Sequence, residues 1–266
     1  MAFVSVEVVL DSIDKHGNRL TTMALKYPRF IHAEFMTHRV FSRSASSSRA
    51  IPVNRMLKNI LGNPARPDTW GKNVPGMQAG EELTPVRKAI ASSAWFVACF
   101  SACAASWVMH KIGLHKQHAN RVTEPFQYIT TLVTATEWDN FFALRAHPDA
   151  QPEIQKLAVA MRKALDKSTP KLLGQGQWHL PYLQDHERTA HPLRELLRIS
   201  SARCARVSYL NHDGSAPNAK GDLALFERLA GSEPIHASPL EHVATPTYNG
   251  NTNFVGWKQF RKVIEG

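Results

Sequence analysis

Cysteine is scarce in this sequence, and no two cysteines have the spacing of a metal-binding or redox pair. The chain of 266 residues contains only Cys99, Cys103 and Cys204. An odd number without a C-x-x-C motif argues against a disulfide framework and against a cysteine zinc site. We therefore expect a protein of a reducing compartment, the cytoplasm, with no bound metal.

Several other signatures are missing. The sequence has no Walker-type phosphate loop, no G-x-G-x-x-G dinucleotide motif, no serine-hydrolase elbow and no H-E-x-x-H zinc motif. Its first residues, MAFVSVEVVLDSID, lack the basic start of a signal peptide. The uncharged stretch 89–109 is long enough to cross a bilayer, but its many serines and alanines predict a buried central helix, with no membrane partner.

Basic residues are present in excess. Lys and Arg number 32 against 22 Asp and Glu, which gives a formal net charge of +10. This balance favours anionic partners such as nucleotides, phosphorylated cofactors or nucleic acid. The hydrophobic content of 43% is that of a globular protein. We expect one α+β domain over residues 1–266, with a loop-rich insertion at 168–192.

Residue patterns predict the order of the elements. Val4, Val6 and Val8 alternate before the turn sequence DKHGN, which indicates a β-hairpin. The segments 42–52 and 63–80 are typical of loops. The tail from residue 242 is expected to form a strand, a turn and a helical end. Helices are expected at 28–40, at 85–112, at 125–143, after an N-cap at Asp149, at 192–207 and at 221–230.

The segment Thr37–Arg49, THRVFSRSASSSR, is the first candidate site. Its arginines 39, 43 and 49 offer forked donors and its serines 42 and 47 offer hydroxyls. Guanidinium groups bind phosphate in a bidentate manner, and serine hydroxyls complete such a shell. The segment is therefore either a phosphate-binding loop or a solvated basic loop.

Three further segments leave two interpretations open. The segment 236–242, HASPLEH, groups His236, Ser238, Glu241 and His242, but its spacing alone does not distinguish a site from the start of a strand. Arg145 lies among apolar residues, so it is either paired or directed at a ligand. The aromatic loop 178–182, WHLPY, either covers a base or flavin or packs as a small cluster.

Together these residues resemble the flavin-dependent thymidylate synthases, the ThyX family. The family signature R-H-R-x-x-S-x-N-x-x-S-x-R is matched at five of its seven defined positions, by His38, Arg39, Ser42, Ser47 and Arg49. The downstream NFFALRAHPDAQPEIQ is similar to the family segment N-F-L-x-L-R-x…A-Q-x-E-I and places Asn140 and Arg145. Arg121 matches a phosphate-binding arginine of the family. The resemblance leaves out residues 53–80 and 168–192.

The order of the motifs differs from that of typical members. The family segment A-R-V-S-F, a helix and H-E-T-P-x-E-H normally precede the R-H-R signature. Here their counterparts, residues 205–209, the helix at 221–230 and residues 236–242, lie near the C-terminus. The resemblance therefore implies a ThyX-like fold that is circularly permuted, with an antiparallel sheet, a long central helix and flanking helices.

The resemblance also implies a function. It implies a homotetramer with FAD between subunits, NADPH as reductant, and 5,10-methylenetetrahydrofolate as donor of a one-carbon unit to C5 of a pyrimidine deoxynucleotide, dUMP to dTMP. Arg145, Ser47 and His236 are implied as catalytic. His38, Arg39, Asn140, Ser208, Ser238 and Glu241 are implied as flavin-binding. Ser47, Ser48, Arg49, Arg121 and Arg145 are implied as substrate-binding.

The sequence departs from the family pattern at several site positions. Thr37, Glu34, Ala45, Thr134 and Thr136 replace the usual residues, and Ser44 replaces an asparagine. These changes admit a dUMP or dCMP hydroxymethylase as an alternative product chemistry. A basic nucleic-acid-binding protein and an inactive homologue are alternatives of other classes. A permuted, divergent nucleotide enzyme is expected in a virus such as a phage, where it acts in the host cytoplasm.

Overall fold

The computed structural model describes residues 3–207, 218–231, 233–247 and 253–265. The strands are β1 (Ser5–Ile13), β2 (Arg19–Pro28), β3 (Ser42–Ala45), β4 (Tyr128–Ala135), β5 (Lys171–Leu172), β6 (Ala244–Pro246) and β7 (Trp257–Gln259). The α-helices are α1 (His32–Phe35), α2 (Val53–Gly62), α3 (Pro85–Lys111), α4 (Lys116–Ala119), α5 (Asp139–Arg145), α6 (Pro152–Lys167), α7 (Asp185–Ala190), α8 (Leu193–Ala205), α9 (Ala219–Ala230) and α10 (Arg261–Ile264). The 3-10 helices are η1 (Arg29–Ile31), η2 (Arg121–Phe126) and η3 (Ser238–His242).

A mostly antiparallel sheet of order β3-β4-β2-β1-β5 forms the centre of the fold. The predicted hairpin is confirmed as β1 and β2, and its turn uses Gly17 at φ +87, a conformation that glycine adopts without strain. Strand β4 pairs on one side with β2 and on the other with β3, which leaves β3 at the sheet edge. The predicted α+β class with an antiparallel sheet is confirmed.

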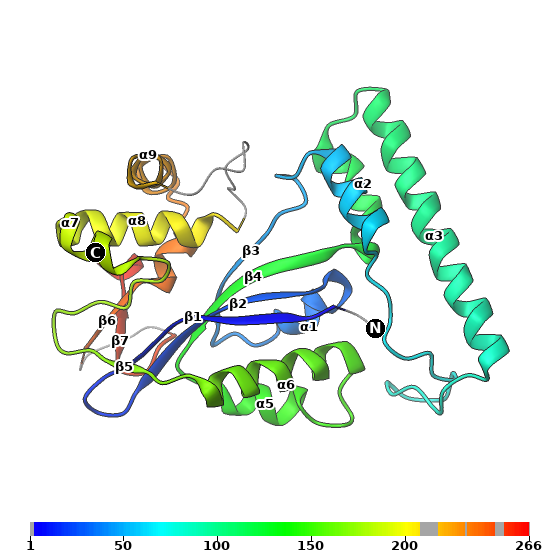
Figure 1. Cartoon of the computed structure of the whole chain (residues 1–266), viewed down its shortest axis with the longest axis horizontal. Coiled ribbons are helices and arrows are strands. Elements are labelled where there is room, and N and C mark those ends of the chain that lie inside the picture. Colours follow the sequence, from blue (N-terminus) through cyan, green and yellow to red (C-terminus); the bar gives the residue numbers. More distant parts are fainter. Residues whose placement is uncertain (1–2, 208–217, 232, 248–252, 266) are drawn as a thin grey trace.

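The two faces of the sheet are covered differently. On one face Met23, Leu25 and Val133 pack with α5 and α6 in the largest hydrophobic core. On the other face β3 and β4 contact η3, and Leu20 packs against Trp257 of β7. Figure 1 shows α5 and α6 on one side of the sheet and α8 and α9 on the other. The C-terminal segments therefore meet the N-terminal strands in space.

Helices α7, α8 and α9 are joined by buried ion pairs. Arg203 of α8 contacts Glu187 of α7 at 2.5 Å and Asp222 of α9 at 2.8 Å. Arg206 contacts the second oxygen of Asp222 at 2.5 Å. Bidentate pairing with Arg203 lowers the pKa of Glu187 to about 2. These ion pairs join α8 to α7 and α9, and α8 in turn packs against η3, which contacts the sheet.

Several expectations about elements are wrong. Residues 128–135, expected within a helix over 125–143, form strand β4, because their β-branched side chains fit a buried sheet position. The helix expected at 28–40 stops at Phe35, the N-cap of α6 is Gln151 rather than Asp149, and the serine-rich loop contains β3. Helix α2 was not predicted, whereas the helices at 85–112, 192–207 and 221–230 are confirmed as α3, α8 and α9.

Helix α3 is not buried as expected. Of the residues in α3, only Cys99, Cys103 and Ser106 are buried. Its most apolar 18-residue segment has a mean hydropathy of 1.5, and 17% of that segment is buried. By length and composition it is the one helix among the described residues that could cross a membrane. Helix α3 lies to one side of the sheet, and α2 lies between α3 and the sheet (Figure 1). Among the described residues, the rest of the chain therefore leaves most of this apolar helix uncovered.

Candidate functional site

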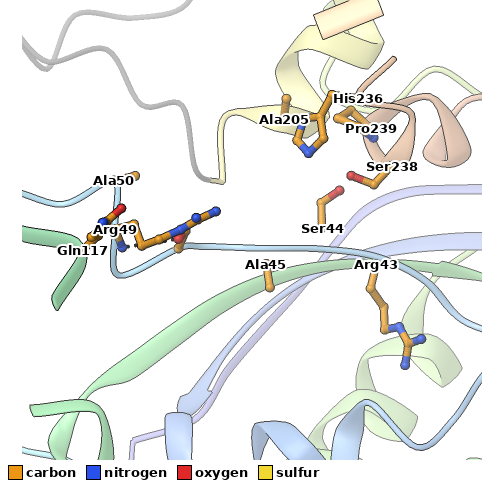
Figure 2. Close-up of a pocket in the computed structure, with 11 residues that line it drawn as sticks. Arg43, Ser44, Ala45, Arg49, Ala50, Gln117, Ala205, His236, Ser238 and Pro239 are labelled. Atoms are coloured by element: carbon orange, nitrogen blue, oxygen red, sulfur yellow. Dashed lines mark hydrogen bonds between the residues drawn. The ribbon is translucent and has the colours of Figure 1, made fainter. Parts of the chain in front are cut away.

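A pocket lies at the sheet edge, where β3 meets η3. Its volume is about 510 Å³, and it is lined by Ser47 and Arg49 from the N-terminal part of the chain and by His236 and Ser238 from the C-terminal part. Figure 2 shows Arg49, His236 and Ser238 with Ser44, Ala205 and Gln117 around the same space. Hydroxyl, imidazole and guanidinium donors in one concave site suit an anionic ligand. Four of the predicted site residues thus share one pocket.

The alternation of side chains along β3 determines which of them face this pocket. Ser44 points toward Ser238 and His236, whereas Arg43 points to the opposite side of the strand (Figure 2). The Arg43 guanidinium donates to the backbone oxygens of Met36 at 2.8 Å and His38 at 3.2 Å. The Arg43 guanidinium therefore braces the segment before β3, although Arg43 is itself among the residues that line the pocket.

The loop that carries Ser47 and Arg49 is held in place from β4 and from η2. Ser46 N–H donates to the Thr130 oxygen at 2.8 Å, and the Thr130 N–H donates back to Ser46 Oγ at 3.1 Å. The buried Asn120 side chain donates to the backbone oxygens of Ser48 at 2.7 Å and Ile51 at 2.9 Å. These bonds fix the loop before a ligand arrives, which reduces the entropy cost of binding.

Replacing the loop support is expected to lower stability. Asn120→Ala removes two buried hydrogen bonds and leaves two backbone oxygens without their donor, so we expect the free energy of unfolding to fall by about 1–3 kcal/mol. Urea unfolding measures this change. Asn59→Ala, at an exposed position of α2, is the matched control and is expected to change stability by less than about 0.5 kcal/mol. Equal effects of both substitutions would contradict the role assigned to Asn120.

A second cluster of predicted residues lies around Arg145, at the end of α5. Its Nε donates to His38 Nε2 at 3.1 Å, and its other nitrogens contact Glu34 at 3.3 Å and Thr37 at 3.4 Å. Burial and the neighbouring Arg145 and Arg43 guanidinium groups lower the pKa of His38. His38 is thus a neutral acceptor that orients Arg145.

Among the described residues, the second cluster does not line the pocket that contains His236. His38 and Arg145 belong to the side of β3 that Arg43 faces, and they are absent from the lining of the pocket that contains His236. Within one chain, His38 is therefore not part of the lining of the pocket that contains His236; that the two residues bind the same flavin stays a prediction.

The other predicted residues that the structure describes are not among those that line the pocket. Ser48 is buried and donates to Glu124 Oε1 at 2.8 Å, and Arg121 contacts the same oxygen at 2.9 Å. Glu241 pairs with Arg261 at 2.6 Å. Arg39 and Asn140 are exposed. Ser208 lies outside the described residues.

One pocket residue was missed in the sequence, and one open alternative can be decided from the packing. Gln117 follows the long helix and reaches the pocket through the fold alone, so no sequence signal identified it. The aromatic loop at 178–182 serves packing: Trp178 contacts Phe260 edge to face, and His179 is fully buried. Among the described residues no group of three or more His, Cys, Asp or Glu side chains could hold a metal ion.

Comparisons with known proteins agree with this architecture. The Thy1 family model, described as thymidylate synthase complementing protein, matches residues 19–171. Crystal structures of a UMP/dUMP methylase PolB from Streptomyces cacaoi are similar, one bound with 5-Br dUMP (19% identity, TM-score 0.51) and one bound with 5-Br UMP (17% identity, TM-score 0.50). Each match covers 63% of this chain and 91% of that chain. No curated protein sequence matches.

Proposed function

Because the chain belongs to the family of thymidylate synthase complementing proteins, which matches it over residues 19–171, we propose that it transfers a one-carbon unit to C5 of a pyrimidine nucleotide. The proposed reaction is dUMP to dTMP, with 5,10-methylenetetrahydrofolate as carbon donor, FAD as cofactor and NADPH as reductant. One observation carries the proposal: Ser47 and Arg49, inside the family match, line one pocket with His236 and Ser238, far outside it in sequence.

The residues present suit a phosphate-bearing, flat ligand. The pocket volume of about 510 Å³ lies within the range of small-molecule sites. Arg49 and the Ser47 hydroxyl offer charge-assisted and neutral donors to a phosphate. Ser238, His236 and Ser44 offer polar contacts for a ring system. Bound flavin would supply the hydride that completes a methyl group.

The chain's own groups bind and polarise the substrate. In the proposed mechanism Ser47 and Arg49 hold the nucleotide phosphate, with Ser48 of the same loop and Arg121 of η2 nearby. Arg145 contacts the pyrimidine and stabilises negative charge as the ring becomes nucleophilic at C5, an electrostatic role. The hydrogen bond that its Nε–H donates to neutral His38 and its ion pair with Glu34 fix its orientation. No cysteine nucleophile is needed, and all three cysteines are buried.

A complete site requires a second copy of the chain. Arg145 and Ser47 lie on opposite sides of β3, so one chain presents two half-sites. If copies assemble edge to edge, the Arg145 half-site of one copy joins the Ser47 pocket of its neighbour. In the proposed homotetramer, this arrangement would allow His38 of one copy and His236 of its neighbour to hold the same flavin.

The apolar stripe of α3 supports the assembly. Val86, Ile90, Val97 and Phe100 recur at helical spacing, with 64% of Val97 and 58% of Phe100 exposed. Covering this stripe with the same helix of another copy removes it from water, which stabilises a symmetric oligomer.

Charge on this stripe is expected to break the oligomer. Val97→Glu places a carboxylate in the apolar contact, so native mass spectrometry should show smaller species than for the unmodified protein. Val159→Glu makes the same change at an exposed position of α6 and should leave the assembly unchanged. A Val97→Glu protein that keeps the mass of the unmodified assembly would contradict the proposed interface.

Cofactor binding tests the proposal. Purified protein is expected to be yellow or to take up FAD with the absorbance of a bound flavin, and to bind dUMP in isothermal titration. Protein that stays colourless with added FAD and does not bind dUMP would overturn the proposed function. Steeply salt-dependent binding to DNA or RNA would instead favour the nucleic-acid-binding alternative.

A further inference from the structure

An unbroken chain of side-chain hydrogen bonds crosses the sheet and ends at the pocket wall. It begins at Ser12 Oγ, which lies 2.8 Å from His179 Nδ1, and continues from His179 Nε2 to Thr22 Oγ1 at 2.8 Å. Thr22 Oγ1 lies 2.7 Å from Thr134 Oγ1. Thr134 Oγ1 lies 2.8 Å from His242 Nδ1, and His242 Nε2 lies 3.0 Å from Ser44 Oγ. The chain thus connects a buried serine with a pocket serine.

Both imidazoles in this chain are neutral. His179 and His242 are fully buried, and burial lowers the pKa of each to about 3. A neutral imidazole has one N–H donor and one acceptor nitrogen. Each histidine therefore accepts a hydrogen bond from one neighbour and donates one to the other. The threonine hydroxyls between the histidines must donate in the same direction along the chain. The chain has two possible polarities.

The two polarities differ in which hydroxyl is left without an acceptor. If donation runs from Ser44 toward Ser12, the last proton is that of the Ser12 hydroxyl, which is 1% exposed and has no other partner among the described residues. A buried hydroxyl proton without an acceptor is costly. If donation runs from Ser12 toward Ser44, every buried donor is satisfied. The remaining proton is then on Ser44, in the pocket, where a ligand or water accepts it.

We infer that this buried chain holds the Ser44 hydroxyl as a hydrogen-bond donor into the pocket, where it binds an acceptor oxygen of the ligand. Ser44 is then a binding residue, and His242 and Thr134 are positioning residues that act through it. The chain does not deliver protons, because its far end at Ser12 is buried and its histidines stay neutral. The nature of the ligand rests on the proposed function: the acceptor is an oxygen of the flavin or of the nucleotide.

Histidine tautomers test the polarity without any ligand. In ¹⁵N-histidine-labelled protein, both imidazoles are expected to be neutral with the proton on Nε2, since Ser12 donates to His179 Nδ1 and Thr134 donates to His242 Nδ1. The spectra of His179→Gln and His242→Gln assign the signals. A proton on His242 Nδ1 reverses the polarity and overturns the inference, whether or not the protein binds FAD or dUMP.

Ligand titrations test the role of Ser44. Ser44→Ala is expected to weaken binding of FAD or of dUMP about tenfold, and the ligand affected identifies the acceptor. Thr134→Val should weaken binding of the same ligand, but it should cause no further loss of affinity when Ser44→Ala is already present. Thr134→Ser keeps the hydroxyl and should bind the ligand with normal affinity. The inference is overturned if Ser44→Ala binds every ligand of the unmodified protein, FAD and dUMP alike, with unchanged affinity. If the unmodified protein binds neither, the proposed function fails and the tautomers alone decide the inference.

Discussion

A mixture of two inactive variants, Ser47→Ala and Arg145→Ala, is expected to recover activity. Each substitution alone removes a group that holds or polarises the substrate, so each should lower turnover by on the order of 10²–10³-fold. In a co-expressed mixture, a site built from two chains can receive Ser47 from one variant and Arg145 from the other. Random assembly then gives intact residues at about one quarter of the sites, and about that share of the unmodified activity.

The structure offers a matched control for this experiment. Ser47 and Arg49 line the same pocket of one chain, so mixing Ser47→Ala with Arg49→Ala cannot rebuild a complete half-site. That mixture should stay inactive. If the Ser47→Ala and Arg145→Ala mixture also stays inactive, although native mass spectrometry shows mixed oligomers, the site does not draw these residues from different chains.

Acid is expected to destabilise the fold through its two buried histidines. The pKa of His179 and of His242 is lowered to about 3 in the fold, from 6.5 in an unfolded chain. The unfolded state therefore binds more protons as the pH falls below 6.5, and stability decreases. Each histidine should lower the free energy of unfolding by about 2 kcal/mol between pH 8 and pH 5, or about 4 kcal/mol for the pair.

Urea unfolding between pH 8 and pH 5 measures this loss. His32, whose pKa burial lowers to about 4, adds to the loss over the same range. His242→Gln is therefore the informative comparison, because it removes one titrating group and its loss should be smaller by about 2 kcal/mol. His186→Gln alters an exposed histidine and should keep the full loss. An identical pH dependence in His242→Gln and the unmodified protein would contradict a neutral, buried His242.

Local patterns were sufficient to predict the elements whose side chains repeat regularly. The alternating valines of β1 and the uncharged run of α3 gave the hairpin and the long helix at nearly their observed bounds. Strand β4 was predicted as helix because its position between β2 and β3 is decided by distant residues. The burial of α3 was overestimated because an uncharged run in a sequence does not show whether another part of the chain covers it.

Only part of the site could be predicted, because its assembly also depends on residues that are distant in sequence. Motif residues such as Ser47, Arg49 and His236 were identified from the resemblance, and the fold brings them to one pocket. The separation of Arg145 from this pocket depends on which side of β3 each side chain faces. The buried chain of hydroxyls and imidazoles joins residues from 12 to 242, and no spacing along the sequence indicates it.

The mass of the nucleotide product tests the central claim most directly. The protein is incubated with FAD, NADPH, 5,10-methylenetetrahydrofolate and either dUMP or dCMP, and the nucleotide is weighed by mass spectrometry, with Arg145→Ala as the blank. The account predicts that dUMP gains one CH₂ group, as in dTMP. A gain of CH₂O identifies the hydroxymethylase alternative, and nucleotides of unchanged mass would contradict one-carbon transfer by this protein.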